Sequence, residues 1–92
     1  MREIIHDETK QEFVLKLENN EQAIVNYTME DGKMKLVYSK VPNHLQGKGI
    51  GKELVEKTFK KLTEGGFKAK AVCSYIRVVA MRSSKWKEII EY

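Results

Sequence analysis

The sequence predicts an α+β fold. A three-stranded antiparallel meander should come first, followed by a strand–helix–strand crossover, which is an α/β unit, and then by a C-terminal helix. Three observations predict it. Three segments between residues 12 and 41 alternate apolar and polar side chains with the period of a strand. Residues 50–64 place their apolar side chains at helical spacing, directly after a glycine-rich loop. A further alternating segment, 67–73, follows that helix.

The three meander strands are separated by short polar connections. The segments are 12–17, 22–29 and 34–41. Asn19 and Asn20 tolerate a positive φ in the first connection, and Asp31-Gly32 in the second is the strongest short hairpin signal. Pro42 ends the third strand, because proline cannot donate to a sheet ladder. We therefore expect the three strands to be neighbours in chain order.

The second half of the chain should form a parallel crossover. The apolar face of helix 50–64 opposes a lysine-rich face, and Gly65-Gly66 is a good helix end. Strand 67–73 should then lie parallel to strand 34–41, with a right-handed connection. Ser74 is expected to cap a helix over 75–81. The tail, 85–92, has apolar spacing for one or two more helical turns.

Chain length and composition restrict the class of protein. The 92 residues correspond to one small domain, expected over 1–92, and exclude an enzyme with a separate substrate domain. A composition of 41% hydrophobic and 33% charged residues argues against disorder. No apolar stretch approaches the ~20 residues of a membrane helix, and the acidic start lacks a signal-peptide core. The single cysteine, Cys73, fits a reducing compartment, so we expect a cytoplasmic protein without membrane contact.

The loop before the helix has the features of an anion site. Residues 46–51 read Gln-Gly-Lys-Gly-Ile-Gly between a strand and a helix. Amides at a helix start lack intrahelical partners and carry the positive end of the helix dipole. Glycines let a phosphate approach those amides, and Lys48 and Lys52 add charge. A tight turn would also use glycine, but three glycines in five residues beside two lysines favour an anion site.

Two common phosphate motifs do not fit this loop. The P-loop requires a glycine five positions before its Gly-Lys-Ser/Thr end, where this chain has Pro42, and Gly49 replaces the hydroxyl residue. The dinucleotide fingerprint, started at Gly47, ends on Lys52 instead of glycine. An acidic residue about 20 positions further on is also missing. The loop therefore belongs to another class of anion site.

Gln46, Gly49 and Gly51 form a Gln-x-x-Gly-x-Gly pattern that resembles the acetyl-CoA loop of the GNAT superfamily of N-acetyltransferases. The order of elements is also similar to that superfamily's core. Its short, stand-alone branch has a Val-Pro-x-x-Leu-x-Gly-x-Gly-Ile-Gly loop and a cysteine that ends the fourth strand before an aromatic residue. Residues 41–51 and 73–75 match these patterns. The resemblance spans about residues 13–92 and implies a minimal GNAT-like fold and acetyl transfer to an amine.

The resemblance implies acetyl-CoA as cofactor and a set of residues that bind it. Amides of residues 45–51 would hold the pyrophosphate. The pantetheine arm would lie between two splayed parallel strands, with Tyr38, Ser39 and Lys40 beside the thioester and backbone groups as oxyanion donors. The implied cofactor-binding residues are Val41, Leu45, Gln46, Gly47, Lys48, Gly49, Ile50, Gly51, Lys52 and Arg77.

Ser39, Cys73 and Tyr75 are the candidate catalytic residues. Cys73 ends the strand that faces the thioester, where it could accept the acyl group, protonate the leaving thiolate or line the pocket. Free cysteines are often simply buried, and no histidine neighbour is visible to activate this one. Tyr75 is a candidate acid for the CoA thiolate, or an aromatic packing residue. The short branch usually has a His-Thr pair where this chain has Tyr38 and Ser39, and proline in place of Ser74.

Other candidate residues are assigned structural roles. His44 is expected to be a solvated loop residue, and His6, near a frayed chain end, is assigned no role. Two distant histidines and one cysteine do not make a metal site, which requires three or four ligands at recognisable spacing. Trp86 and Tyr92 are expected to cover the core or the edge of the sheet.

Two other functions remain open at this point. A net charge of +4 favours anionic partners, and a small nucleic-acid-binding module would use the lysines with Tyr27 and Tyr38 stacking on bases. The RNA-recognition signature is missing, so nucleic-acid binding should be weak and non-specific. A non-catalytic acyl-CoA-binding protein is the second alternative, because the chain has little room for acceptor recognition. For the acetyltransferase that the resemblance implies, we expect a small-molecule or protein amine as acceptor, and we expect the chain to be a monomer or weak homodimer.

Overall fold

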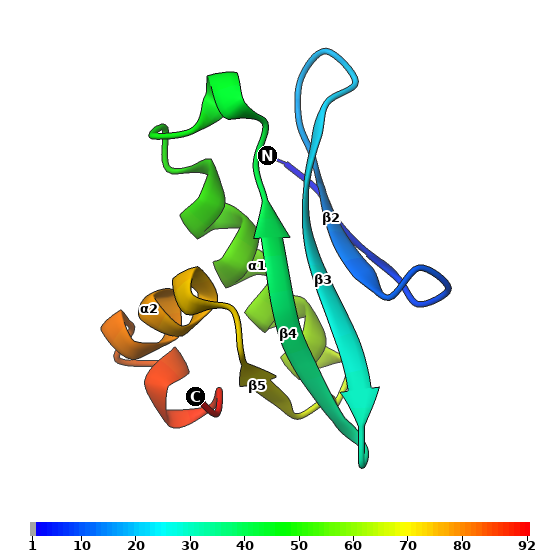
Figure 1. Cartoon of the computed structure of the whole chain (residues 1–92), viewed down its shortest axis with the longest axis vertical. Coiled ribbons are helices and arrows are strands. Elements are labelled where there is room, and N and C mark those ends of the chain that lie inside the picture. The colour runs from blue at the N-terminus through cyan, green and yellow to red at the C-terminus, as the bar shows by residue number, and fades with distance from the viewer. Residues whose placement is uncertain (1) are drawn as a thin grey trace.

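A five-stranded sheet with the order β1-β2-β3-β4-β5 is the framework of the molecule (Figure 1). The computed structural model describes residues 2–92. The strands are β1 (Ile4–Asp7), β2 (Glu12–Lys16), β3 (Gln22–Glu30), β4 (Lys33–Lys40) and β5 (Ala69–Ala71). The helices are α1 (Ile50–Glu64) and α2 (Ser74–Arg82), and the 3-10 turns are η1 (Asn43–Leu45) and η2 (Trp86–Glu88).

The sheet topology confirms the predicted α+β fold. Strands β1 to β4 pair antiparallel in chain order, and β5 pairs parallel to β4 after the α1 crossover. The buried residues of the sheet share one face, apart from Val14, and join both helices in a single core cluster. The loop from β4 to α1 follows the C-terminal end of β4 and lies at one end of the molecule (Figure 1).

Helix α1 has the bounds predicted from its pattern, residues 50–64. Its apolar face packs into the core through residues that are almost fully buried: Leu54, Val55, Phe59 and Leu62. Gly65 follows the helix, and Gly66 adopts a φ of +82°, a conformation that glycine adopts without steric cost. The apolar face thus fixes the helix on the sheet, with its first turn directly after the glycine loop.

Strand β1 was not predicted. Ile4 pairs with Leu15 and His6 with Phe13, so the strand adds a fourth antiparallel neighbour to the predicted meander. Its inward positions alternate an isoleucine with a histidine, and this hides the apolar period on which strand prediction depends. The expectation of a frayed chain end at His6 is therefore wrong.

His6 is half-buried among aromatic side chains. Its ring stacks on Phe13 with a centroid distance of 4.3 Å, and its Nε2 atom lies 2.6 Å from the hydroxyl oxygen of Tyr27. Burial lowers the pKa of His6 below its usual value, and the charge of Lys61 adds to this, while Asp7 and Glu8 oppose it. Folding therefore favours the neutral imidazole.

The C-terminal elements differ in detail from the prediction. Strand β5 is shorter than the predicted segment 67–73. Helix α2 begins at Ser74 itself, with Cys73 at the N-cap position and no side-chain capping bond, so the prediction of a Ser74 cap is wrong. The tail forms one 3-10 turn and a single parallel bridge between Lys70 and Glu91.

The two aromatic residues of the tail have different environments. Trp86 is buried and its ring lies 5.5 Å from that of Phe59, as the prediction of a core residue requires. Tyr92 is 43% exposed and is therefore not a core residue; it follows Glu91, which pairs with the edge strand β5. No helix among residues 2–92 has the length and apolar character needed to cross a membrane.

The burial of His6 predicts a specific pH dependence of stability. Unfolded His6, with a pKa of about 6.5, takes up a proton before the folded residue does, so the free energy of unfolding should fall as pH drops from about 7 to about 5. Urea denaturation across this range should show that the fall is smaller in His6→Phe. His44→Gln is the control and should keep the wild-type slope. An identical slope in His6→Phe would contradict the assignment.

Candidate active site

The loop between β4 and α1 exposes its backbone. Gly47 and Gly49 have φ values of +82° and +80°, and no atom lies within 4 Å of the place where a Cβ would stand on either residue. Glycine is needed at both positions for the backbone conformation, and the space over them is open. The side-chain amide of Gln46 donates to the carbonyl oxygen of Val41 at 3.3 Å and to Oδ1 of Asn43 at 3.2 Å, which braces the loop from within.

The loop leads directly into the first turn of α1. Gly49 is the N-cap residue and supplies no side-chain capping bond, while its carbonyl oxygen accepts the amide of Glu53. The first amides of the helix therefore have no intrahelical acceptor and point out of the helix end with the positive end of its dipole. Gly51 lies beneath the ring of Tyr75, since a Cβ there would stand 3.1 Å from the tyrosine oxygen.

A cavity of about 430 Å³ joins this loop to the end of β4. It is lined by Ser39, Val41, Gln46, Gly47, Gly49, Gly51 and Tyr75. Five of these are predicted cofactor-binding residues and two are predicted catalytic residues. A larger and shallower hollow of about 650 Å³ lies beside Arg2, Glu18 and Glu53, away from the candidate catalytic groups. We take the smaller cavity as the candidate site because it joins the predicted residues.

Strands β4 and β5 separate at the mouth of this cavity (Figure 1). Their ladder ends at the pair Leu36 and Ala71, and the carbonyl oxygen of Leu36 accepts the amides of both Val72 and Cys73. Strand β4 continues to Lys40 and carries a bulge at Val37, where its register with β3 shifts. The last residues of β4 are thus unpaired on the side of β5. An extended ligand could pair with this strand edge.

The candidate catalytic residues meet where the strands separate. The Ser39 hydroxyl oxygen lies 3.7 Å from the Cys73 sulfur, within the range of a sulfur hydrogen bond, and Cys73 is half-buried. Tyr75 is 43% exposed and lines the same cavity. The two histidines lie elsewhere: His6 contacts Tyr27, and exposed His44 pairs with Glu21 at 3.0 Å. The site therefore contains the hydroxyl groups of Ser39 and Tyr75 and the thiol of Cys73. Among the described residues, neither histidine contacts these groups.

The remaining predicted site residues surround the cavity. Lys48, Lys52 and Arg77 are exposed, and Lys52 lines a neighbouring groove of about 400 Å³ that also includes Tyr75 and Arg82. The side chains of Leu45 and Ile50 line a small pocket behind the loop. For those two residues only backbone groups are available to a ligand at the loop. Arg2 and Glu18, which also line this rear pocket, had no signal in the sequence.

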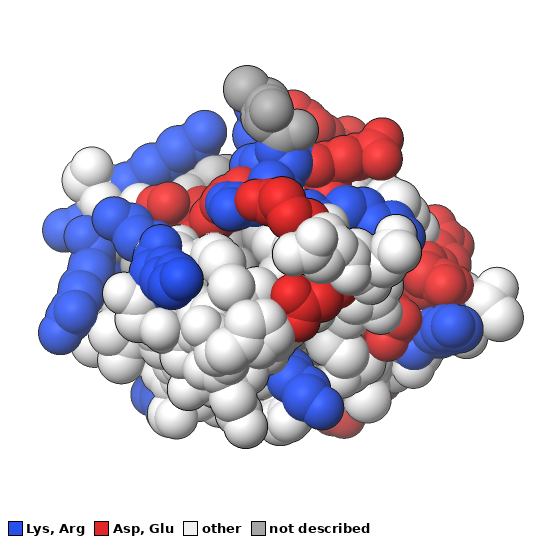
Figure 2. Space-filling view, turned by 90° about the horizontal axis from the view of Figure 1, so that it is seen from above, with Lys and Arg blue, Asp and Glu red and all other residues white. Residues whose placement is uncertain are grey.

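Charge is distributed unevenly around this end of the molecule. Figure 2 looks onto it and shows Lys and Arg side chains mainly at the left, acidic side chains mainly at the top and right, both signs together in the upper middle, and a largely uncharged area below. The cavity lining itself contains no charged residue.

Comparison with known proteins assigns the family. Residues 12–89 match the family described as GCN5-related N-acetyl-transferase. The chain belongs to this family. Its fold is similar to the NMR solution structure of a GCN5-like protein from Staphylococcus aureus, with a TM-score of 0.68 and 22% identity over 96% of this chain and 86% of that chain. At this identity the likeness shows the fold alone. Among curated proteins, none matches the chain.

Family membership confirms the resemblance inferred from the glycine loop and the terminal cysteine of the fourth predicted strand. It supports acetyltransferase activity in general terms. The match covers the meander, the crossover and α2, and it begins at Glu12, after β1.

The conformation of Gly49 predicts a measurable cost of substitution. Gly49→Ala should lower the free energy of unfolding by about 1–2 kcal/mol, because alanine is strained at a φ of +80°. Lys48→Ala is the matched control, since Lys48 is exposed and lies outside the positive-φ residues, and should change stability by less than about 0.5 kcal/mol. Equal stabilities of the two variants in urea denaturation would show that the loop conformation is wrong.

Proposed function

We propose that the protein is an acetyl-CoA-dependent N-acetyltransferase that transfers the acetyl group to the amine of a small molecule or a protein. The cavity between the open glycine loop and the Ser39–Cys73 pair supports this most strongly. Acetyl-CoA supplies an activated acetyl thioester when it is bound. An elongated anionic molecule of this kind requires an anion site, a long slot and polar groups at the far end.

The residues of this chain fit those three requirements. Amides from Gly47 to Gly51 would hold the pyrophosphate, because the two positive-φ glycines leave open space above the backbone. Exposed Lys48, Lys52 and Arg77 would add attraction for the phosphates. The unpaired edge of β4 offers backbone groups to the amides of the pantetheine arm.

The groups at the strand ends would promote the reaction itself. Backbone amides near Ser39 would polarise the thioester carbonyl, and the Tyr75 hydroxyl would give a proton to the leaving thiolate. No carboxylate or imidazole lines the described part of the cavity. We therefore propose that the acceptor amine loses its proton to water, and that the protein contributes chiefly by positioning.

Direct transfer is the simpler route for the acetyl group. A covalent route through Cys73 would need a base to form the thiolate, and its described polar partner is the hydroxyl of Ser39. We propose that Cys73 lines the thioester pocket. A non-catalytic acyl-CoA-binding protein is the second candidate function, favoured by the lack of a general base among the lining residues.

Further partners and location follow from the same reasoning. We propose that the chain works as a monomer or weak homodimer in the cytoplasm, where its single free cysteine would remain reduced. We propose no specific nucleic-acid partner, because the face seen in Figure 2 carries basic side chains mainly at the left and acidic ones mainly at the top and right, instead of one basic surface.

Acetyl-CoA should bind at the glycine loop. In a titration followed by backbone NMR, amide shifts should concentrate at residues 38–52 and 73–77, because these segments enclose the cavity and its mouth. Gly49→Val should abolish these shifts while the sheet signals remain, since the altered loop no longer offers its amides. Shifts spread over the lysine-rich outer face of α1 would contradict the proposal.

Tyr75→Phe should separate binding from turnover. The variant should lower kcat about 100-fold, the lower end of a general-acid contribution, with little change in KM for acetyl-CoA. Cys73→Ser is the comparison and should still bind the cofactor. When the wild type is incubated with acetyl-CoA, mass spectrometry of the intact protein should detect no acetylated protein. Stoichiometric acetylation that is lost in Cys73→Ser would establish a covalent route instead.

A further inference from the structure

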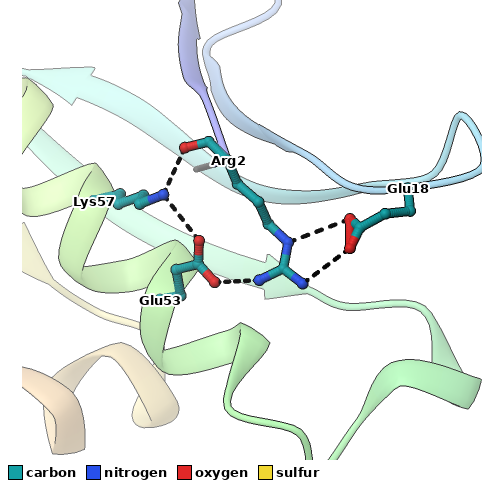
Figure 3. Close-up of polar contacts among 4 residues, drawn as sticks. All are labelled: Arg2, Glu18, Glu53 and Lys57. Carbon is teal, nitrogen blue, oxygen red and sulfur yellow. Dashed lines mark hydrogen bonds and ion pairs between the residues drawn. The ribbon is translucent and has the colours of Figure 1, made fainter.

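Arg2 connects three elements behind the glycine loop (Figure 3). Its guanidinium bonds to Glu18, after β2, through contacts of 3.4 and 3.3 Å, and to Glu53 of α1 at 2.5 Å. Lys57 completes the network, because its ammonium group donates to the carbonyl oxygen of Arg2 at 2.5 Å and lies 2.9 Å from Glu53. Arg2, two residues before β1, is thereby attached to the first turns of α1.

Glu53 stands close to the proposed phosphate site. It is the acidic residue of the first turn of α1, and its amide donates to the carbonyl oxygen of Gly49. A carboxylate here stabilises the helix dipole, but it also repels an anion bound at the same helix end. Anion binding at this helix therefore depends on how well the charge of Glu53 is balanced.

The charge of Glu53 is balanced by two cations. Its side chain is 26% exposed, so burial alone would raise its pKa, but the hydrogen bonds from Lys57 and Arg2 hold the pKa below its usual value. Glu53 is thus ionised at neutral pH, between an arginine from one end of the chain and a lysine one turn further along the helix. Lys57 bonds within α1, whereas Arg2 reaches the carboxylate from outside the crossover.

We propose that Arg2 is a positioning residue for acetyl-CoA: it fixes the first turn of α1 against the β2–β3 connection and cancels the charge of Glu53 beside the phosphates. The inference rests on the proposed function. None of the described bonds of Arg2 reaches a residue that lines the candidate site. Arg2 would nevertheless determine the affinity for the cofactor, through its bonds to Glu18 and Glu53.

The charge-balancing part of this role predicts opposite effects at the two partners. Arg2→Gln leaves the Glu53 charge partly uncompensated and loosens the helix start, so the dissociation constant for acetyl-CoA should rise about three- to tenfold at low salt. Glu53→Gln removes the repelling charge, so binding should be unchanged or tighter. In the double variant, Glu53→Gln should restore part of the affinity that Arg2→Gln loses.

Isothermal titration of the full chain with acetyl-CoA tests these expectations. Lys16→Gln is the matched control, because Lys16 lines the same hollow and its loss changes the net charge equally, yet it has no bond in this network. It should bind acetyl-CoA within about twofold of the wild type. A urea denaturation of each variant checks that the protein titrated is folded.

The outcomes separate this inference from the proposed function. If the wild type does not bind acetyl-CoA, the proposed function fails and this inference with it. If the wild type binds and Arg2→Gln binds equally well, only the role of Arg2 is overturned. Equal weakening by Lys16→Gln, or weakening by Glu53→Gln as large as that by Arg2→Gln, would show a net-charge or purely structural effect instead. If Arg2→Gln is unfolded, Lys57→Gln tests the same balance, with weaker binding expected and equal binding contradicting it.

Discussion

The carbonyl oxygen of Leu36 accepts two amides, those of Val72 and Cys73, and the candidate site depends on this arrangement. A regular parallel ladder uses each carbonyl once, so the double acceptance ends the pairing of β4 with β5. Beyond that point β4 continues with an unpaired edge, while the chain after β5 turns into α2 (Figure 1). One irregular hydrogen-bond pattern therefore creates both the opening between the strands and the approach of Cys73 to Ser39.

Helix α1 performs two tasks at opposite ends of its sequence. Its buried residues anchor it on the sheet, and Phe59 also contacts Trp86 from the tail. The core holds the helix along its length, from Ile50 in the first turn to Leu62, while the backbone amides of that first turn have no intrahelical acceptor. The chain enters that turn through a left-handed Gly49, which aims the loop at the cavity instead of the core.

The early part of the chain supports the glycine loop from behind. Arg2 bonds to Glu53 in α1, and Glu21, just before β3, pairs with His44 in η1. These contacts join segments that are far apart in the sequence, and each reaches one side of the loop. A loop with two positive-φ glycines has little intrinsic rigidity, so such external contacts limit its conformations. Arg2, which lies outside the matched family region, is therefore joined to the helix that begins at the candidate site.

Local patterns in the sequence determined α1, the meander, the glycine loop and the family, because helical period, strand alternation and glycine spacing are properties of neighbouring residues. Residues Gln46, Gly49 and Gly51 could be identified in this way. Strand β1 could not, because His6 breaks the apolar alternation and is stabilised only by Phe13 and Tyr27 from other strands. Likewise, the distance between Ser39 and Cys73 and the bond between Arg2 and Glu53 depend on where β4 separates from β5 and how α1 lies on the sheet. Those contacts come from packing across long stretches of chain, which only the tertiary structure decides.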